Sequence, residues 1–590
     1  MQFLTVYIIL QSLKGCKIGF LYHFIIFHLI CFVLEYIKTH NGYLSGMRDA
    51  ASLNIDITRG NTMKKEQIKN KAVKIKKTGL NALVNLVFSR IMLIVILMLI
   101  QIILLFGLFT IMGEYSQWVL YSLNILAAVL VVVIINSNDN PAFKLAWMVP
   151  LCVVPVFGAV LYLLVRINPA SIGIKKGLHQ NIKDTKEYLT PNEDVVQRMW
   201  KENVPITDLA YYIQHVNGFP SYDKTKVSYF PDGEAKFLDL IPELEKAEKF
   251  IFLEYFIINP GRVWEEILAV LERKAAEGVE VRLMYDGFNS ILKLPRKYPE
   301  KLREKGIQVK VFAPVIPFFS SHQNYRDHRK ILIIDGKLAY NGGINLADEY
   351  MNYIERFGYW KDTAIKLSGD AVKSFTAMFL QMWNISEPGK EDYGKYLNAD
   401  CGTDESCKNG FVIPYNDDPC NGEDVAEEVY IDILNKARSY VYIMTPYLIP
   451  ENEIITALKF AAQRGIDVRI IMPHIPDKKV AFSVAHTYYP KLLEAGVKMY
   501  EFTPGFVHAK MFLSDDIKAV VGTINLDFRS LYEHYECAAF IYDNPVIGDI
   551  KEDFRRTFDQ CERFTEGDYK KLPLGHRVCG RICRLFAPLM

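Results

Sequence analysis

The chain has 590 residues, of which 50% are hydrophobic and 13% aromatic, and this composition excludes an intrinsically disordered protein. Its 69 lysine and arginine residues nearly cancel 67 aspartate and glutamate residues, leaving a formal net charge of +2. Because a large nucleic-acid footprint needs a concentrated basic surface, this balance predicts no nucleic-acid partner. The length exceeds what one hydrophobic core normally spans, so several domains are expected.

The first 62 residues are of uncertain status. They contain an apolar run at 18–34, but two histidines interrupt it and no small-residue cleavage site is evident nearby. Met63 opens a lysine-rich stretch that leads into the first long apolar run, as a natural start would. We therefore predict that residues 1–62 are an extension from a misplaced start codon.

Residues 63–170 are predicted to form a membrane domain with two to three transmembrane helices. Three apolar runs follow one another, at 91–112, 118–135 and 145–165. The first and third are long enough to cross a hydrocarbon core of about 30 Å, whereas a buried core helix is the alternative for a single run. Basic residues flank the whole region on both sides, which favours an even number of crossings and a cytoplasmic catalytic portion.

Beyond about residue 200 the sequence predicts an α/β fold that is duplicated. A strand, a helix and a strand are expected at 250–258, 263–276 and 278–285, and the same order recurs at 440–444, 453–463 and 465–472. We interpret residues 200–390 and 426–565 as two pseudo-symmetric α/β halves, preceded by the N-terminal transmembrane helices. Residues 391–425 are rich in Gly, Asp, Asn and Pro and are predicted to be a linker.

Each half ends in the same polar set with the same spacing. The first set is His328, Lys330 and Asp335 with Gly342, Gly343 and Asn345, and the second is His508, Lys510 and Asp515 with Gly522, Thr523 and Asn525. The two histidines are 180 residues apart, as are the two asparagines. Because side chains two apart on a strand share a face, the histidine and lysine of each half should point the same way. A turn after the strand can then bring the asparagine to the same place.

An imidazole, an ammonium and an amide at one locus suit a phosphodiester, because they supply a nucleophile or proton carrier and donors for the phosphate oxygens. One copy alone would usually be an exposed strand edge, but two matching copies argue against coincidence. Zinc binding is the other alternative, although each His-x-Lys offers one ligand with a cation beside it. We therefore expect no metal and no cofactor.

The doubled His-x-Lys-x4-Asp signature resembles that of the phospholipase D superfamily. Within it the chain is similar to bacterial cardiolipin synthases from about residue 85 to the end, including residues 140–147, 155–158, 253–256, 445–450, 525–530 and 584–588. The paired motifs are specific for the superfamily, and the apolar region with the segment 445–450 indicates the synthase. The resemblance does not cover residues 1–62.

The resemblance implies an enzyme that transfers a phosphatidyl group between two phosphatidylglycerol molecules, giving cardiolipin and glycerol through a phosphohistidine. It makes His328 the nucleophile and His508 the general acid. It assigns the phosphate oxygens to Lys330, Lys510, Asn345 and Asn525. It also implies a multi-pass protein of the cell membrane with phospholipids as partners, while leaving the oligomeric state unknown.

Other activities remain as alternatives. A phospholipase D-type hydrolase would use the same intermediate with water as the acceptor. A nuclease poorly explains the apolar runs, and a noncatalytic membrane scaffold does not need two intact motifs.

Carboxylates are expected to orient the two imidazoles, as in other catalytic triads. Glu536 falls where the resemblance places such a group, and Asp362 is the candidate in the first half. Surface salt bridges are the alternative for both residues. The motif aspartates Asp335 and Asp515 are expected to brace strands and turns rather than to touch substrate.

The remaining signals are the cysteines and the C-terminal tail. Of ten scattered cysteines, Cys401, Cys407 and Cys420 share a polar segment, where they form either a surface disulfide or free thiols. Within the basic tail, residues 566–590, arginines alternate with apolar residues from Arg577 to Met590. It is predicted either to lie at an anionic lipid surface or to pack as a helix on the core.

Overall fold

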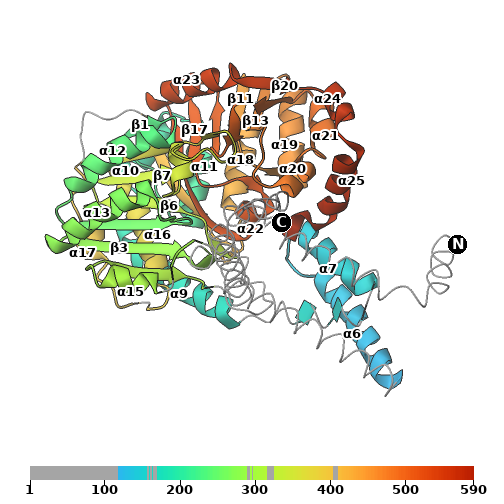
Figure 1. The fold of residues 1–590 in the computed structure, drawn as a ribbon, viewed down its shortest axis with the longest axis horizontal. Coiled ribbons are helices and arrows are strands. Elements are labelled where there is room, and N and C mark those ends of the chain that lie inside the picture. Colours follow the sequence, from blue (N-terminus) through green and yellow to red (C-terminus); the bar gives the residue numbers. More distant parts are fainter. Residues whose placement is uncertain are drawn as a thin grey trace, which may run out of the picture. The chain divides into compact units, whose positions relative to one another are not determined.

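The computed structural model describes residues 117–153, 155, 158–159, 162–163, 169–288, 293–295, 297–314, 325–387, 389–402 and 410–589. The predicted extension, 1–62, and the first apolar run, 91–112, lie outside this part of the chain. Within the described part, two α/β halves follow each other along the sequence, the first coloured mainly green to yellow and the second orange to red (Figure 1).

The first half contains a seven-stranded sheet. Its strand order is β1 (Thr225–Phe230), β9 (Ala364–Gly369), β7 (Leu338–Gly342), β6 (Lys330–Ile334), β2 (Phe250–Tyr255), β3 (Glu280–Asp286) and β4 (Gln308–Phe312). Strands β2, β3 and β4 are parallel, and β2 pairs antiparallel with β6. Helix α13 (Arg262–Ala276) connects β2 to β3 and buries an apolar face, so the predicted crossover unit is confirmed.

The second half repeats this sheet strand for strand. Its order is β10 (Phe411–Asp417), β19 (His534–Tyr542), β17 (Lys518–Gly522), β16 (Met511–Ser514), β11 (Tyr440–Met444), β13 (Asp467–Pro473) and β14 (Lys498–Phe502), with β20 (Cys561–Phe564) added at the edge. Helix α19 (Asn452–Gln463) connects β11 to β13, as α13 does in the first half. The predicted internal duplication is therefore confirmed at the level of sheet topology.

The described residues of the segment predicted as a linker, 391–425, include regular structure. It contains α17 (Gly394–Leu397) and β10, which pairs along its whole length with β19. All seven residues of β10 are buried, so this strand is an integral part of the second sheet. The prediction was wrong here because the surrounding glycines and aspartates obscured a short buried strand.

The described residues of the N-terminal region include α6 (Gln117–Ile135), which coincides with the second predicted apolar run, and α7 (Pro141–Val153), which starts before the third and includes Pro150. The two helices contact each other, and Trp147 packs edge-on against Tyr162 with ring centroids 5.3 Å apart. Among the described residues, no helix combines the length and the apolar character that crossing a membrane requires.

The C-terminal tail folds as α24 (Glu566–Lys571), α25 (Leu574–Cys583) and the 3-10 helix η5 (Arg584–Leu589). One side of helix α25 packs against α20 (Lys479–Ala485), as the packed-helix alternative predicts, while its other side stays exposed.

Two of the three clustered cysteines fall within the described part of the chain. Cys401 and Cys420 are both free thiols, whereas Cys407 lies outside the described residues. The disulfide interpretation is therefore wrong for Cys401 and Cys420.

The two halves are joined by a buried ion pair. Lys361, at the end of β8 (Tyr359–Lys361) in the first half, lies 2.7 Å from both carboxylate oxygens of Asp553 on α23 (Val546–Phe558) in the second half. Tyr229 on β1 donates to the same carboxylate at 2.5 Å. Both charged side chains are almost fully buried, so each depends on the other for compensation.

The substitution Asp553→Ala should destabilise the protein by about 3–5 kcal/mol, because it leaves the Lys361 ammonium buried without a counter-charge. Thermal unfolding of the purified chain in detergent measures the effect. Asp549→Ala, an exposed position on the same helix, is the control and should change stability by less than about 1 kcal/mol. Equal midpoints for the two variants would contradict a bracing role for the pair.

Candidate active site

The first histidine of the paired motifs is held by the second half. His328 follows the short strand β5 (Arg326–Asp327), which pairs in parallel with the start of β19. Its backbone N–H donates to the Tyr535 carbonyl at 3.0 Å. In the same register, its Nδ1 lies 2.7 Å from Oε1 of Glu536, the next residue of β19.

The second histidine is held by the first half in the same way. His508 follows β15 (Gly505–Val507), which pairs in parallel with β8. Its backbone N–H donates to the Lys361 carbonyl at 2.6 Å, and its Nδ1 lies 2.6 Å from Oδ2 of Asp362. Each imidazole is therefore paired with the carboxylate of the opposite half.

Glu536 and Asp362 are both fully buried, so the alternative of surface salt bridges is wrong. The sequence predicted these two residues as orienting groups, but it did not indicate that the halves exchange them. The exchange follows from the strand pairings, β5 with β19 and β15 with β8, which link residues far apart in the chain.

Glu536 is the acceptor of several hydrogen bonds. Ser530, on α22 (Phe528–Tyr532), donates to Oε1 at 2.8 Å, and the Thr523 hydroxyl donates to Oε2. Burial alone would raise the pKa of Glu536, but interaction with His328 outweighs it and lowers the pKa below its ordinary value. Burial lowers the pKa of His328 well below its ordinary value. At neutral pH the pair is thus a carboxylate and a neutral imidazole whose Nδ1–H donates, which leaves Nε2 as a lone-pair nitrogen.

The glycine at 343, where the second half has threonine, is explained by the other carboxylate. A Cβ at Gly343 would overlap Oδ1 of Asp362, so a side chain there would displace the group that holds His508. At the matching position Thr523 instead donates its hydroxyl to Glu536. The two motifs are therefore alike in topology and different in how they hold their carboxylates.

The two motif lysines lie beside the imidazoles. The ammonium groups of Lys330 and Lys510 donate to the carbonyls of His328 and His508. Burial lowers the pKa of Lys330 to about 8 and that of Lys510 to about 7, although Glu536 and Asp362 act in the opposite direction on both. Both carboxylates affect the pKa of each lysine, so the charged groups of the two halves surround one common site.

The His508 imidazole is neutral in the free site. Burial first, and the neighbouring Lys510 next, lower its pKa to about 4, against the effect of Asp362. Tyr350 packs edge-on against His508 with ring centroids 5.3 Å apart. An anion placed between the histidines would reverse this balance, because negative charge favours the protonated imidazole.

The predicted phosphate-binding asparagines are buried and already engaged within the protein. Asn345 accepts from the Ile257 N–H at 2.9 Å and donates to the Tyr350 hydroxyl at 2.8 Å. Asn525 donates to Ser530 at 3.0 Å, while its Oδ1 has no hydrogen-bond partner. Each amide nitrogen has a second hydrogen, so each side chain retains one donor for a ligand.

The two motif aspartates accept hydrogen bonds from backbone N–H groups. Asp335 accepts from the N–H groups of residues 248, 249 and 250 at 2.7–2.8 Å, and Asp515 accepts from those of 438, 439 and 440 at 2.8–3.0 Å. Both residues have positive φ, 54° and 55°, in the turns after β6 and β16. They fix the starts of β2 and β11 rather than facing the histidines.

Two groups of side chains in the described part of the chain could hold a metal ion: His328 with His534 and Glu536, and Glu427 with Glu451 and Glu453. The sequence did not single out His534, whose ring centroid lies 5.3 Å from that of His328. In the sequence, the only indication that His534 belongs to the site was its position two residues before Glu536. In the first group Glu536 already accepts from His328, Ser530 and Thr523, so metal-free chemistry remains our prediction.

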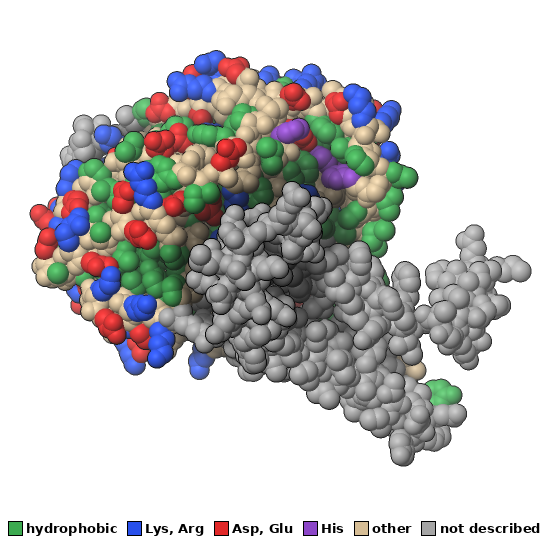
Figure 2. All heavy atoms as spheres, viewed as in Figure 1, with side chains coloured by type: hydrophobic (Ala, Val, Ile, Leu, Met, Phe, Trp, Pro, Cys, Tyr) green, Lys and Arg blue, Asp and Glu red, His purple; other side chains and the backbone are tan. Residues whose placement is uncertain are grey.

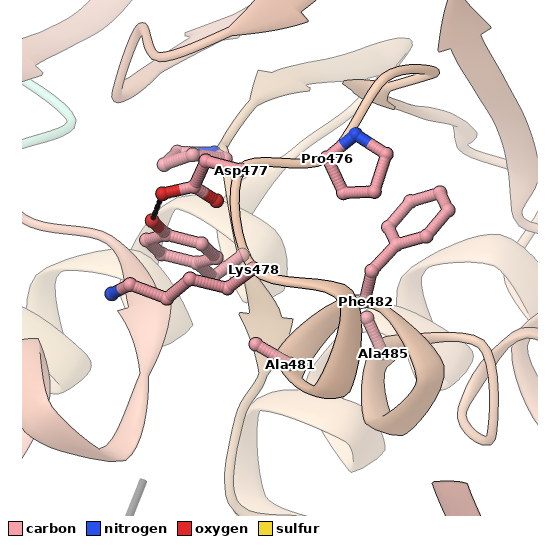
Figure 3. Close-up of a pocket in the computed structure, with 8 residues that line it drawn as sticks. Pro476, Asp477, Lys478, Ala481, Phe482 and Ala485 are labelled. Carbon is pink, nitrogen blue, oxygen red and sulfur yellow. Dashed lines mark hydrogen bonds between the residues drawn. The ribbon is translucent and has the colours of Figure 1, made fainter. Parts of the chain in front are cut away.

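A shallow pocket lies beside α20 (Figure 3). Its lining comprises Pro446, Tyr447, Pro476, Asp477, Lys478, Ala481, Phe482 and Ala485. The Tyr447 hydroxyl donates to Asp477 at 2.6 Å, and the Asp477 charge contributes to raising the pKa of Tyr350, the ring that packs on His508. The mostly apolar pocket is therefore a neighbour of the histidine site.

Two matching α/β halves with crossed histidine–carboxylate pairs define a phospholipase D-like protein. The family model described as "Cardiolipin synthase, PLD-like domain" matches residues 240–383 and 430–558. A second model, "Phospholipase_D-nuclease N-terminal", matches residues 125–166. The chain belongs to the cardiolipin synthase family.

Relatives extend over most of the chain. An uncharacterized protein of Streptococcus mutans is 50% identical over 460 residues, 78% of this chain and 99% of that protein. Cardiolipin synthases of Halalkalibacterium halodurans and Geobacillus kaustophilus are 32% and 34% identical, covering 82% and 81% of this chain and 97% and 94% of their own lengths. These matches support cardiolipin synthase function, and with it a phosphatidyltransferase enzyme, as the resemblance implied.

The charge states predict an alkaline fall in kcat/KM. Lys510 and Lys330 are cationic below pKa values of about 7 and about 8 and lose that charge as pH rises through them. His508 stays neutral above about 4. Because the predicted general acid, His508, must first take up a proton that the free site does not hold, a pH profile of kcat/KM, which reports the free enzyme, should fall about tenfold per pH unit from pH 5 and more steeply above pH 7. Lys510→Arg should remove the steepening near pH 7 and leave the one near pH 8, whereas an acid limb near 6.5 would contradict these assignments.

Proposed function

We propose that the protein makes cardiolipin by transferring a phosphatidyl group from one phosphatidylglycerol to another through a phosphohistidine on His328. The observation that carries this proposal is the crossed arrangement, in which two buried imidazoles are each oriented by a carboxylate at hydrogen-bond distance. Two such groups suit a double displacement, which needs one nucleophile and one proton carrier.

In the first step, Nε2 of His328 attacks phosphorus and the bond to the glycerol headgroup oxygen breaks. His508 gives its Nε2 proton to that oxygen, so glycerol leaves as a neutral alcohol. The imidazole of the phosphohistidine carries positive charge, which the anionic Glu536 stabilises through the Nδ1–H. The bound phosphodiester raises the pKa of His508 and so allows it to be protonated before the transfer.

In the second step, a hydroxyl of another phosphatidylglycerol attacks the same phosphorus and the P–N bond breaks. His508, now neutral, takes the hydroxyl proton, and His328 returns to its neutral form. Lys330 and Lys510 lie where they can stabilise the charge on the phosphate oxygens, with Asn345 and Asn525 each retaining one donor.

Transfer is favoured over hydrolysis by the burial of the site. His328 and His508 are 7% and 8% exposed, so little water reaches the imidazoles in the free protein. A lipid hydroxyl positioned in such a site competes well with water. The hydrolase remains the second candidate, because both reactions share the intermediate.

The relatives suggest a membrane-associated protein, and we propose that residues 63–170 anchor it with several crossings. The apolar runs, the match of the N-terminal family model to residues 125–166, and the exposed apolar side chains of α6 support this anchor. The basic flanks support a cytoplasmic location of the catalytic halves.

Labelled phosphatidylglycerol incubated with the purified full chain in mixed micelles separates the candidates. We expect cardiolipin and glycerol as products, whereas phosphatidic acid would indicate the hydrolase. His328→Ala should lower turnover by about 10³-fold or more, because no other group can form the covalent intermediate. Normal cardiolipin formation by this variant would refute the assignment of the nucleophile.

Glu536→Gln and Asp362→Asn should separate the two histidine roles. Each change removes one orienting carboxylate and should lower turnover of phosphatidylglycerol by about 10²–10⁴-fold. With a phosphatidyl p-nitrophenyl ester, whose leaving group departs as a stable anion, Asp362→Asn should regain formation of the intermediate, since no general acid is needed.

Glu536→Gln should remain defective with the p-nitrophenyl ester, because the nucleophile itself is impaired. Glu562→Gln, at an exposed position on β20, is the matched control and should behave as the wild type with both substrates. Rescue of Glu536→Gln instead of Asp362→Asn would contradict the assignment and would make His508 the nucleophile and His328 the general acid.

A further inference from the structure

The C-terminal tail presents an apolar surface to solvent. Five large apolar side chains of α25 and η5 are between 37% and 73% exposed: Leu574, Val578, Ile582, Leu585 and Phe586. In Figure 2, hydrophobic side chains gather at the right-hand edge of the molecule, over α25. We call these five side chains the tail face. A cluster of this kind at a surface usually marks an interaction site rather than a chance exposure.

The charged residues around the tail face are all basic. Residues 569–590 contain five basic residues, Lys570, Lys571, Arg577, Arg581 and Arg584, and no aspartate or glutamate. Exposed Lys478 and Lys479 lie at the start of α20, the helix on which α25 packs. Apolar side chains bordered by cations suit an anionic phospholipid surface, whose headgroups attract the cations while the acyl region accepts the apolar groups.

The tail is fixed in this orientation. Gly580 lies so close to the Ser483 carbonyl of α20 that any side chain there would overlap it. His576 is within hydrogen-bond distance of His486 and Ser483, both at 2.9 Å, and His486 contacts Glu501 at 3.0 Å. These contacts hold one side of α25 against the core, so the helix cannot turn to bury the tail face.

The tail face continues into the N-terminal helices. Helix η5 contacts α7, whose Leu145 and Val149 are also more than half exposed. Helix α7 is anchored to the second half by Phe143, whose ring is 6.0 Å from that of Phe528. The exposed apolar surface thus extends from the tail to the segment assigned above to the membrane anchor.

We propose that the tail face, together with the cations around it, lies on the surface of an anionic phospholipid bilayer and forms a second membrane contact beside the N-terminal anchor. This inference rests on the proposed function, because the lipid substrate supplies the anionic surface. The contact fixes α20, which lines the pocket beside the histidine site, at the level of the headgroups. A second copy of the chain is a poorer occupant, since two such basic faces would repel each other.

Photocrosslinking of the full chain in phosphatidylglycerol nanodiscs tests this contact. The probe is a photoreactive phosphatidylglycerol, and crosslinked peptides are located by mass spectrometry. Outside the N-terminal anchor, crosslinks should concentrate in residues 574–586, and these should decrease at high salt because screening weakens attraction to the headgroups. The double variant Val578→Asp/Ile582→Asp should lose at least five-fold of this crosslinking, and its activity in nanodiscs should fall similarly.

Controls keep the outcomes distinct. The double variant should keep wild-type activity, within two-fold, on phosphatidylglycerol dissolved in mixed micelles, which shows that it folds. Leu238→Asp, an equally exposed apolar position on α12 (Gly233–Glu245) of the first half, should change neither readout. Absence of tail crosslinks, or crosslinks from the tail to a second copy of the chain, would overturn the proposal. A wild-type chain inactive in micelles would overturn the proposed function instead, whatever the crosslinks show.

Discussion

The exchange of carboxylates between the two halves is the interaction on which the site depends. His328 is 2.7 Å from Glu536 and His508 is 2.6 Å from Asp362, and in each pair the partners come from opposite halves. A half on its own would lack the imidazole that its carboxylate orients and the strand that covers it. Docking of the halves and assembly of the site are therefore one event, braced by Lys361 and Asp553 beside Asp362.

The same burial sets the charge of every reacting group. It keeps both imidazoles neutral and lowers the pKa of both lysines, to about 8 for Lys330 and about 7 for Lys510. In this state the lysine ammonium groups favour an anion at the centre of the site, and a phosphodiester supplies that negative charge. Substrate binding is thus expected to raise the pKa of the imidazoles, and the two carboxylates that they contact stabilise the protonated state.

Much of this arrangement could be predicted from the sequence because it depends on local patterns. The strands and helices of both halves, the paired His-x-Lys segments and the identity of Glu536 and Asp362 follow from periodicity, duplication and resemblance. The exchange of carboxylates could not be predicted, since it depends on how β5 meets β19 and β15 meets β8. For the same reason His534 was missed and β10 was taken for linker: their importance comes from neighbours distant in the chain.

A structure of the protein with bound orthovanadate tests the central claim most directly. Vanadate adopts the five-coordinate geometry of phosphorus under attack, so it reports which side chains reach the reacting atom. We predict a single vanadium bonded to Nε2 of His328, with Nε2 of His508 in hydrogen-bond contact with the oxygen on the opposite side. Vanadate bound to one histidine alone, with the other imidazole out of reach, would contradict a shared phosphorus and the mechanism built on it.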